Sequence, residues 1–264
     1  YGFRLMATND PAKIVPWPMP PGYNRNDFLS EIHEANSRSL SVAESHQGFI
    51  TRRVMNDGQP VTAITPVTEY ATNGSDIIGP GAWEYLRLTP PERTELAEQM
   101  AYRMLGRFYT LANDGAVPSG IRASFSSMGL CNDQFQDEYI LVPGWSHTLY
   151  VREARRLIGK EVVTWREAGD QLNWPHQLCV AAYFSDSKAS YQVALADGTT
   201  AREGVLSEEN SNFVYWGVPM EAVLPAAGQA DNLVVPVCAS MSKQAWGSYR
   251  LEPIWSQAGA NSAV

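Results

Sequence analysis

The stretch Asn232-Leu-Val-Val-Pro-Val-Cys-Ala-Ser240 opens the most informative part of this chain. It is a short, valine-rich apolar run with a polar start, which predicts a buried strand over 232–239. Residues 241–252 are rich in small and hydrogen-bonding side chains and predict a loop. Pro253 suits the first turn of a following helix, because its missing N–H needs no partner there. Strand, loop and helix in this order predict converging backbone N–H groups, and such a point favours negative charge.

Composition narrows the class of protein. The chain has 264 residues and a formal net charge of -8, which argues against nucleic acid or an anionic membrane surface as the main partner. No apolar run approaches the roughly 20 residues that a membrane-spanning helix requires, so no membrane span is expected. The three cysteines lie far apart and the four histidines show no ligand spacing, which predicts neither a disulfide framework nor a metal site.

Strand and helix patterns alternate along the chain, which predicts an α+β fold with a mixed β-sheet and packed helices. The strongest helix signal is Thr89-Pro-Pro-Glu92, a capping box followed by apolar residues at helical spacing, with Asn113-Asp-Gly115 as its end. The other expected elements are strands at 1–8, within 48–70, at 161–164 and at 213–218, a hairpin at 190–206, and helices at 27–36 and 149–158.

The residue pattern of the C-terminal segment is similar to that of a known protein family. Asn232-Leu-Val-Val-Pro-Val-Cys238 and Ala245-Trp-Gly-Ser-Tyr-Arg-Leu-Glu-Pro-Ile-Trp255 resemble the C-terminal end of FAD-dependent oxidoreductases with a glutathione-reductase-like flavin fold. Tyr1-Gly-Phe-Arg-Leu-Met-Ala-Thr-Asn-Asp-Pro11 and Leu149-Tyr-Val-Arg-Glu-Ala-Arg-Arg156 resemble further blocks of that family. The likeness therefore extends over nearly the whole chain.

The resemblance implies FAD as cofactor and a division into two parts. Residues 1–230 would form a substrate-facing α+β domain, and 231–264 the closing strand, loop and helix of an FAD-binding α/β domain. A dinucleotide-binding turn has the pattern G-x-G-x-x-G, and the nearest approach here, Gly79-Pro-Gly81, lacks the third glycine. The N-terminal FAD-binding segment is therefore expected to be missing, or to be supplied by a companion chain.

The same resemblance implies which residues face the flavin. A reduced flavin collects negative charge at its N1–C2=O edge, and a helix start with small residues before it suits that edge. The implied cofactor-binding residues are Ser240, Ser242, Gly247, Ser248, Arg250 and Glu252. An arginine and a glutamate that only hold the loop in shape are the alternative for Arg250 and Glu252.

Two lysines depart from the family pattern, which commonly has histidine at these places. Lys243 ends one block, and Lys188 follows Asp186 in another. The resemblance implies that Lys243, Asp186 and Lys188 are the catalytic residues. A lysine serves as a base only if burial or a nearby cation lowers its pKa, and otherwise it is a fixed positive charge. A structural or solvated lysine is the alternative at both positions.

An arginine cluster lies just after the middle of the chain. On the helix expected at 149–158, Arg152, Arg155 and Arg156 would line one face. Arg152 and Arg155 are candidate substrate-binding residues, because guanidinium groups bind carboxylates and phosphates through paired hydrogen bonds. An ion-paired structural helix is the alternative, and it is the commoner outcome for such clusters.

Together these features predict part of a flavin-dependent oxidoreductase, one that removes a hydride from a C–H bond of a small organic substrate. The chain alone, without the FAD-binding segment, is expected to be inactive. The alternative is a non-catalytic binding or scaffold module derived from the same fold, which the two lost histidines favour. The sequence names neither the substrate nor the electron acceptor, and it gives no cellular compartment.

Overall fold

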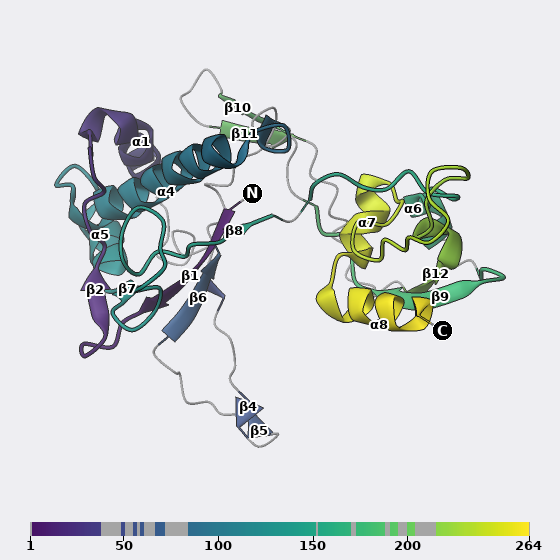
Figure 1. Cartoon of the computed structure of the whole chain (residues 1–264). Coiled ribbons are helices and arrows are strands. Elements are labelled where there is room, and N and C mark those ends of the chain that lie inside the picture. The colour runs from purple at the N-terminus through teal and green to yellow at the C-terminus, as the bar shows by residue number, and fades with distance from the viewer. Residues whose placement is uncertain are drawn as a thin grey trace. The chain divides into compact units, whose positions relative to one another are not determined.

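The computed structural model describes residues 2–37, 49–50, 55–56, 59–60, 67–71, 84–151, 153–169, 173–187, 191–194, 200–203 and 215–263. The chain divides into two compact units, each with its own apolar core (Figure 1). Unit 1 is Tyr1–Val151 with Ala194–Ala201, and unit 2 is Arg152–Val193 with Arg202–Val264.

The core of unit 1 lies between a sheet and a long helix. Strand β1 (Gly2–Thr8) is central, and the sheet order is β2-β7-β1-β6-β3, with β8 also paired to β1. These neighbours pair antiparallel. Their bounds are β2 Ile14–Pro16, β3 Phe49–Ile50, β6 Val67–Ala71, β7 Gly129–Cys131 and β8 Leu149–Tyr150. A separate short antiparallel pair joins β4 (Met55–Asn56) to β5 (Gln59–Pro60).

Helix α4 (Pro90–Asn113) covers this sheet and forms as the sequence predicts. Its first turn is stabilised by Glu92, whose carboxylate accepts hydrogen bonds from the N–H and the hydroxyl of Thr89, both at 2.7 Å. Met104 and Leu105 face the core and are fully buried. Trp145 lies edge-on to Phe3 of β1, with ring centroids 5.6 Å apart, so aromatic packing joins the later loop to the sheet.

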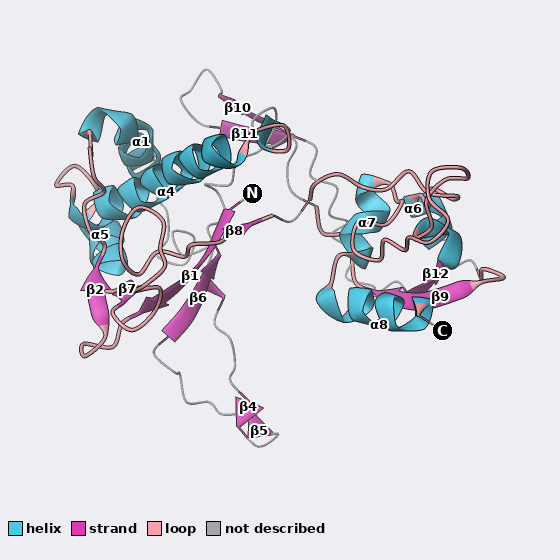
Figure 2. Ribbon diagram, in the orientation of Figure 1, coloured by secondary structure: helices cyan, strands magenta, loops and turns pink. Residues whose placement is uncertain are grey.

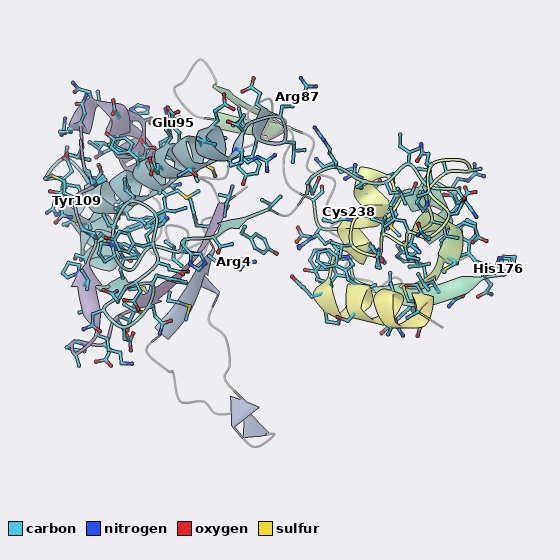
Figure 3. All side chains as sticks on the ribbon, in the orientation of Figure 1. Arg4, Arg87, Glu95, Tyr109, His176 and Cys238 are labelled. Atoms are coloured by element: carbon cyan, nitrogen blue, oxygen red, sulfur yellow. The ribbon has the colours of Figure 1, made fainter. Side chains whose placement is uncertain are left out.

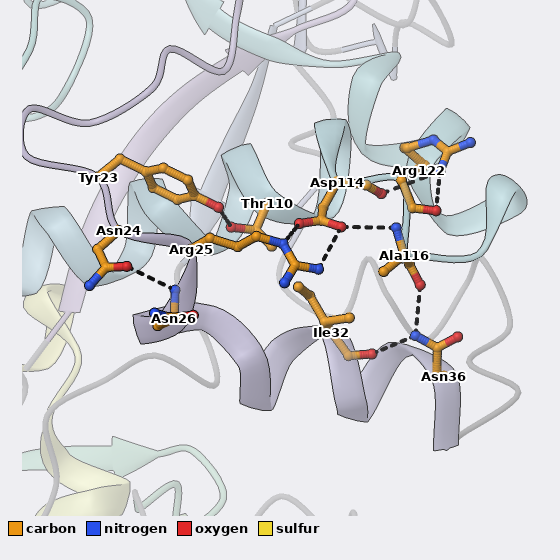
Figure 4. Close-up of polar contacts among 11 residues, drawn as sticks. Tyr23, Asn24, Arg25, Asn26, Ile32, Asn36, Thr110, Asp114, Ala116 and Arg122 are labelled. Atoms are coloured by element: carbon orange, nitrogen blue, oxygen red, sulfur yellow. Dashed lines mark hydrogen bonds and ion pairs between the residues drawn. The ribbon is translucent and has the colours of Figure 1, made fainter.

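Three smaller helical elements pack beside α4 in unit 1. These are η1 (Arg25–Phe28), α1 (Leu29–Ser37) and α5 (Ser119–Ser126). A side chain at Gly106 would place a Cβ 2.0 Å from the ring of Phe28, so glycine is what allows η1 to lie this close to α4. Arg25 pairs with Asp114 at the C-terminal end of α4 (Figure 4). Because η1 and α1 together span residues 25–37, the helix expected at 27–36 is confirmed.

Unit 2 is built on a two-stranded antiparallel sheet. Strand β9 (Gln177–Ala182) pairs with β12 (Tyr215–Pro219), and α8 (Glu252–Ser262) and α7 (Lys243–Tyr249) pack on β9. Helix α6 (Trp165–Gly169) contacts β12, and η2 (Met220–Ala222) follows that strand directly. The core includes the fully buried side chains of Trp216, Val218 and Tyr249, which come from the sheet and from α7.

The prediction of a strand at 232–239 was wrong. In the structure this segment is a loop that precedes α7 (Figure 2). Its backbone bonds go to two different segments: the N–H of Val235 donates to Val223 (2.8 Å), whereas the carbonyl of Cys238 accepts from Leu157 (2.8 Å). Pro236 also lacks an N–H. With its bonds divided in this way, the valine-rich run forms no ladder.

The expected loop at 241–252 is largely helical. Ser242 is the N-cap of α7, because its hydroxyl accepts a hydrogen bond from the N–H of Ala245 at 3.3 Å. Helix α7 ends at Arg250, and α8 starts two residues later with Pro253 in its first turn, as expected. The C-terminal part is therefore a helix–turn–helix and not a strand followed by a loop and one helix.

The helix predicted at 149–158 is absent. Leu149 and Tyr150 pair with β1, and residues 153–158 are irregular. The N–H of Leu157 is bonded to Cys238, so distant partners take the backbone groups that a helix would need. Likewise, the strand predicted at 161–164 is reduced to one parallel bridge between Val163 and Met241.

The α+β class is confirmed, and the strands named above pair antiparallel. The hairpin expected at 190–206 appears as β10 (Tyr191–Ala194) paired with β11 (Thr200–Glu203), and its predicted turn residues lie outside the described residues. Residues 231–264 pack within unit 2. Their assignment to a separate FAD-binding domain stays a prediction.

Candidate functional site

The structure brings together two segments that the sequence analysis singled out separately. Residues 183–187 follow β9 and lie against α7, about sixty positions further along the chain. The hydroxyl of Ser185 donates to the carbonyl of Gln244 at 2.8 Å, and the N–H of Asp186 donates to that of Gly247 at 3.3 Å. These bonds hold the Asp186 segment on one side of α7.

Gly247 favours a close approach at this contact. A Cβ at this position would lie 3.1 Å from the carbonyl oxygen of Asp186 and 3.2 Å from its nitrogen. Both are backbone atoms, which cannot turn aside as a flexible side chain would. The predicted cofactor residue Gly247 therefore serves a close approach of two protein segments.

Arg250 forms the strongest polar contact of the cluster. Its guanidinium pairs with the carboxylate of Asp186 through Nη2 and Oδ2, and its Nε donates to the Asp186 carbonyl at 3.3 Å. The guanidinium carbon also lies 5.8 Å from the ring centroid of Tyr183. The Arg250 side chain is 9% exposed and that of Asp186 is 27% exposed, so water screens this ion pair weakly.

Ser248 is bonded on both sides inside unit 2. Its hydroxyl donates to the carbonyl of Tyr183 at 2.5 Å and accepts from the indole Nε1 of Trp216 at 3.0 Å. Trp216 belongs to β12 and is buried. The serine thus links the sheet, the Asp186 segment and α7, and both of its hydrogen-bonding functions are used.

The other predicted residues lie elsewhere in unit 2. Buried Ser240 accepts a hydrogen bond from the N–H of Gly159 at 3.0 Å, and Ser242 caps α7. Lys243 is half-buried at the start of α7, and Glu252 is exposed at the start of α8. Arg155 is exposed in the irregular segment after β8, where the predicted helical arginine face does not form. Arg152 and Lys188 lie outside the described residues.

Three residues of the cluster were missed as site residues. Tyr183 and Ser185 stand in the same block as Asp186, so their position in the sequence was a signal for them. Trp216 lies some thirty positions from both partner segments, and nothing local to it indicates that its indole N–H bonds Ser248.

The surroundings of α7 are strongly desolvated. Burial raises the pKa of the Tyr249 phenol, and its hydroxyl donates to the carbonyl of Pro236 at 2.5 Å. Burial also raises the pKa of the Cys179 thiol on β9 to about 12. Both groups are therefore neutral near neutral pH.

A hollow in unit 1 is separate from this cluster. It has a volume of about 480 Å³ and is lined by Asp27, Glu98, Gln99, Tyr102, Arg103 and Leu141. None of the predicted site residues lines it. The described parts of the chain contain no group of three acidic, histidine or cysteine side chains placed to hold a metal ion, and no helix in them is both long and apolar enough to cross a bilayer.

A model of the family described as FAD dependent oxidoreductase matches residues 1–264. The chain belongs to this family of FAD-dependent oxidoreductases. Neither a search of curated proteins nor one of solved structures found a match. The family that the sequence motifs indicated is therefore confirmed, and its description implies dependence on FAD. The likeness to glutathione-reductase-like flavin proteins in particular stays a prediction.

The donors around α7 can be compared with what a flavin needs. Gly247 is covered by the Asp186 backbone, and the polar atoms of Ser248 and Arg250 are bonded within the protein, so these three residues do not fit direct contact with the ring. By contrast, the buried indole N–H of Trp255, early in α8, has no acceptor among the described residues, as is also true of those of Trp174 and Trp145. That donor fits a flavin carbonyl or ring nitrogen.

Proposed function

We propose that this chain is part of an FAD-dependent oxidoreductase that removes a hydride from a C–H bond of a small organic substrate. The family match over the whole chain carries this proposal. FAD, when bound, supplies the redox chemistry by accepting the hydride. The protein groups supply binding, orientation and charge.

The chain's own residues would divide these tasks according to their surroundings. Asp186 and Arg250 would fix the turn between α7 and α8 from inside the core. Lys243, half-buried at the start of α7, and Glu252, exposed at the start of α8, would be the charged groups that meet a cofactor or a substrate. Lys243 would act as a fixed positive charge toward an anionic ring or an acidic substrate, or as a base if a bound ligand desolvates it. Arg155 would be a substrate contact from an exposed segment.

We further propose that another segment or a companion chain holds the nucleotide part of FAD. The sequence contains no G-x-G-x-x-G turn, which is the usual cradle for a pyrophosphate at a helix start. The exposed apolar side chains of Leu233 and Val237, next to α7, support this proposal, because an uncovered apolar surface is where another segment packs.

The first experiment is spectroscopic. The full protein is purified with its native flanking sequence and titrated with FAD, and a panel of alcohols and amines is then added under anaerobic conditions. The proposal predicts yellow absorbance that bleaches with at least one substrate. A protein that stays colourless in saturating FAD would refute it.

Variants then test the part of the chain around α7. A double substitution, Lys243→Ala with Arg250→Ala, is expected to lower turnover strongly. Arg25→Ala in unit 1 is the control, because Arg25 lies outside the proposed machinery and is half-exposed. Turnover equal to that of the parent in the double variant would show that this segment has been assigned wrongly.

The second candidate is a non-catalytic module of the same fold. One observation favours it: Gly247, Ser248 and Arg250 all have structural partners, so chemistry is not needed to explain why the block is present. The titration separates the two candidates, since the module predicts no flavin absorbance and no bleaching.

A further inference from the structure

We infer that Asp186 and Arg250 form a positioning pair that ties the α7–α8 turn to the segment 183–187, and that this ion pair helps to set the orientation of the start of α8. The inference deepens the proposed function and rests on it for its catalytic meaning. The structural part, a lock between two distant segments, stands on the contacts alone.

The first argument is where Arg250 sits. It is the C-cap of α7, its backbone N–H donates to the carbonyl of Trp246 at 2.9 Å, and Leu251 is the N-cap of α8. The side chain leaves the turn and reaches inward to Asp186. A guanidinium group held at both Nε and Nη2 fixes its own direction, and thereby that of the turn carrying it.

The second argument is that the N-cap residue of α8, Leu251, provides no side-chain hydrogen bond to hold the start of that helix. Leu251 has no side-chain hydrogen-bonding group with which to cap α8, and the N–H groups of Ile254 and Trp255 already bond to its carbonyl at 3.0 and 3.1 Å. The first turn of α8 is thus tied locally to Leu251, whereas the turn as a whole is tied to the core through Arg250. The Arg250 pair therefore contributes to fixing the position of the first turn of α8.

The third argument is burial. Arg25 and Asp114 in unit 1 form an ion pair of the same chemistry with Nε–Oδ2 at 2.6 Å, but the Arg25 side chain is 49% exposed. The Arg250 side chain is 9% exposed, whereas the two carboxylates differ in the opposite sense, with Asp186 27% and Asp114 11% exposed. The contrast therefore lies in the guanidinium groups: a buried guanidinium is screened less by water than a half-exposed one, which favours the Arg250 pair as the positioning contact.

The test compares two matched variants, Asp186→Asn and Asp114→Asn. Each replaces an arginine-paired carboxylate by an amide of nearly the same shape. In the ligand-free protein, amide hydrogen exchange at residues 250–255 is expected to become about tenfold faster in Asp186→Asn, because a hydrogen bond to a charged group is lost. The same amides are expected to exchange at the parent rate in Asp114→Asn. Unchanged exchange at 250–255 in Asp186→Asn would overturn the lock.

The second readout is the bound flavin. If the lock positions the site, Asp186→Asn should weaken FAD binding by about tenfold and shift the visible circular dichroism of the flavin, while Asp114→Asn changes neither. Arg250→Lys keeps the charge but not the planar fork, and should repeat the effect of Asp186→Asn if that variant folds poorly. Faster exchange with unchanged flavin binding and spectrum would reject the positioning role. If the parent protein binds no FAD, the proposed function is refuted. The hydrogen-exchange comparison then tests the structural role of the Asp186–Arg250 pair by itself.

Discussion

The two arginine–aspartate pairs, one within each unit, show that the two units are stabilised differently. In unit 1, Arg25 and Asp114 meet at the surface of a unit whose core of sheet and α4 is complete without them (Figure 4). In unit 2, the buried Arg250 pairs with the partly exposed Asp186, and hydrogen bonds of Ser185, Ser248 and the Asp186 backbone join the same two segments. The same type of ion pair therefore adds little to the stability of unit 1 and more to the stability of unit 2. Burial of the guanidinium group, and not the type of residue, makes the difference.

The largest effect is expected in the reactivity of the buried cysteines. Burial raises the thiol pKa of Cys131 in unit 1 to about 11 and that of Cys179 in unit 2 to about 12, from an ordinary value of 9.0. Near neutral pH these shifts reduce the reactive thiolate about 100-fold and about 1000-fold respectively. Alkylation followed by mass spectrometry should show Cys238, which is exposed and labelled in Figure 3, reacting first and Cys179 last.

The rates also compare the two units directly, because a buried thiol reacts through opening of the unit that contains it. In the Asp186→Asn variant, Cys179 should be labelled faster than in the parent protein, whereas Cys131 should be labelled at the parent rate. Equal acceleration at both cysteines would mean that the two units open together.

The next effect is the loss of the buried charge pair. Arg250→Met leaves the partly exposed Asp186 carboxylate without its partner, and should lower the free energy of unfolding of unit 2 by about 2 kcal/mol, the size of a lost hydrogen bond to a charged group. Arg25→Met should change the unfolding midpoint of unit 1 only slightly, because the pair is exposed to water. Urea unfolding followed by tryptophan fluorescence measures both. Similar losses in the two variants would contradict the contrast drawn from burial.

A smaller effect is expected at two helical glycines. Gly247→Ala adds a Cβ 3.1 Å from the Asp186 carbonyl and should destabilise unit 2 by about 1 kcal/mol, since overpacking outweighs the gain in helix propensity. Gly120→Ala in α5 meets no atom within 4 Å and should stabilise unit 1 by about 0.5 kcal/mol. Thermal unfolding of the two variants tests the difference in sign, and stabilisation by both would show that α7 can move away from Asp186.

The smallest effect is a pH dependence of unit 1. Hydrogen bonds from the Thr89 hydroxyl and N–H lower the pKa of the Glu92 carboxyl below its ordinary value of 4.5. A carboxyl whose folded pKa is lowered adds stability that is present above about pH 4.5 and is lost as the pH falls through the folded value. Glu92→Gln should therefore reduce the acid dependence of the unfolding midpoint.

Thr89→Val removes the hydroxyl donor and should act in the same direction. Thr94→Val is the matched control, because the Thr94 hydroxyl bonds only the carbonyl of Pro90 in the same helix. A change in acid dependence with Thr94→Val as large as with Thr89→Val would show that the cap is not the cause.

The candidate site was predictable only in part. The family motifs selected Asp186, Gly247, Ser248 and Arg250, and the structure brings these four together. Their partners could not be predicted, because a motif identifies residues but not contacts sixty positions away. The alternative first considered for Arg250 was a pair with Glu252, two positions on. The observed partner is Asp186, since Arg250 points into the core whereas Glu252 is exposed at the surface.

What the sequence determined by itself is local. The Thr89–Glu92 cap and the apolar spacing after it specify α4, and the alternation at residues 2–8 specifies β1, because the stabilising contacts lie within a few residues or follow a regular period. Only the tertiary structure decided that 232–239 is a loop, that α7 replaces a loop, and that residues 153–158 are not helical. In those places distant segments take the backbone N–H and carbonyl groups, and a pattern of apolar residues does not specify which distant partner will satisfy them.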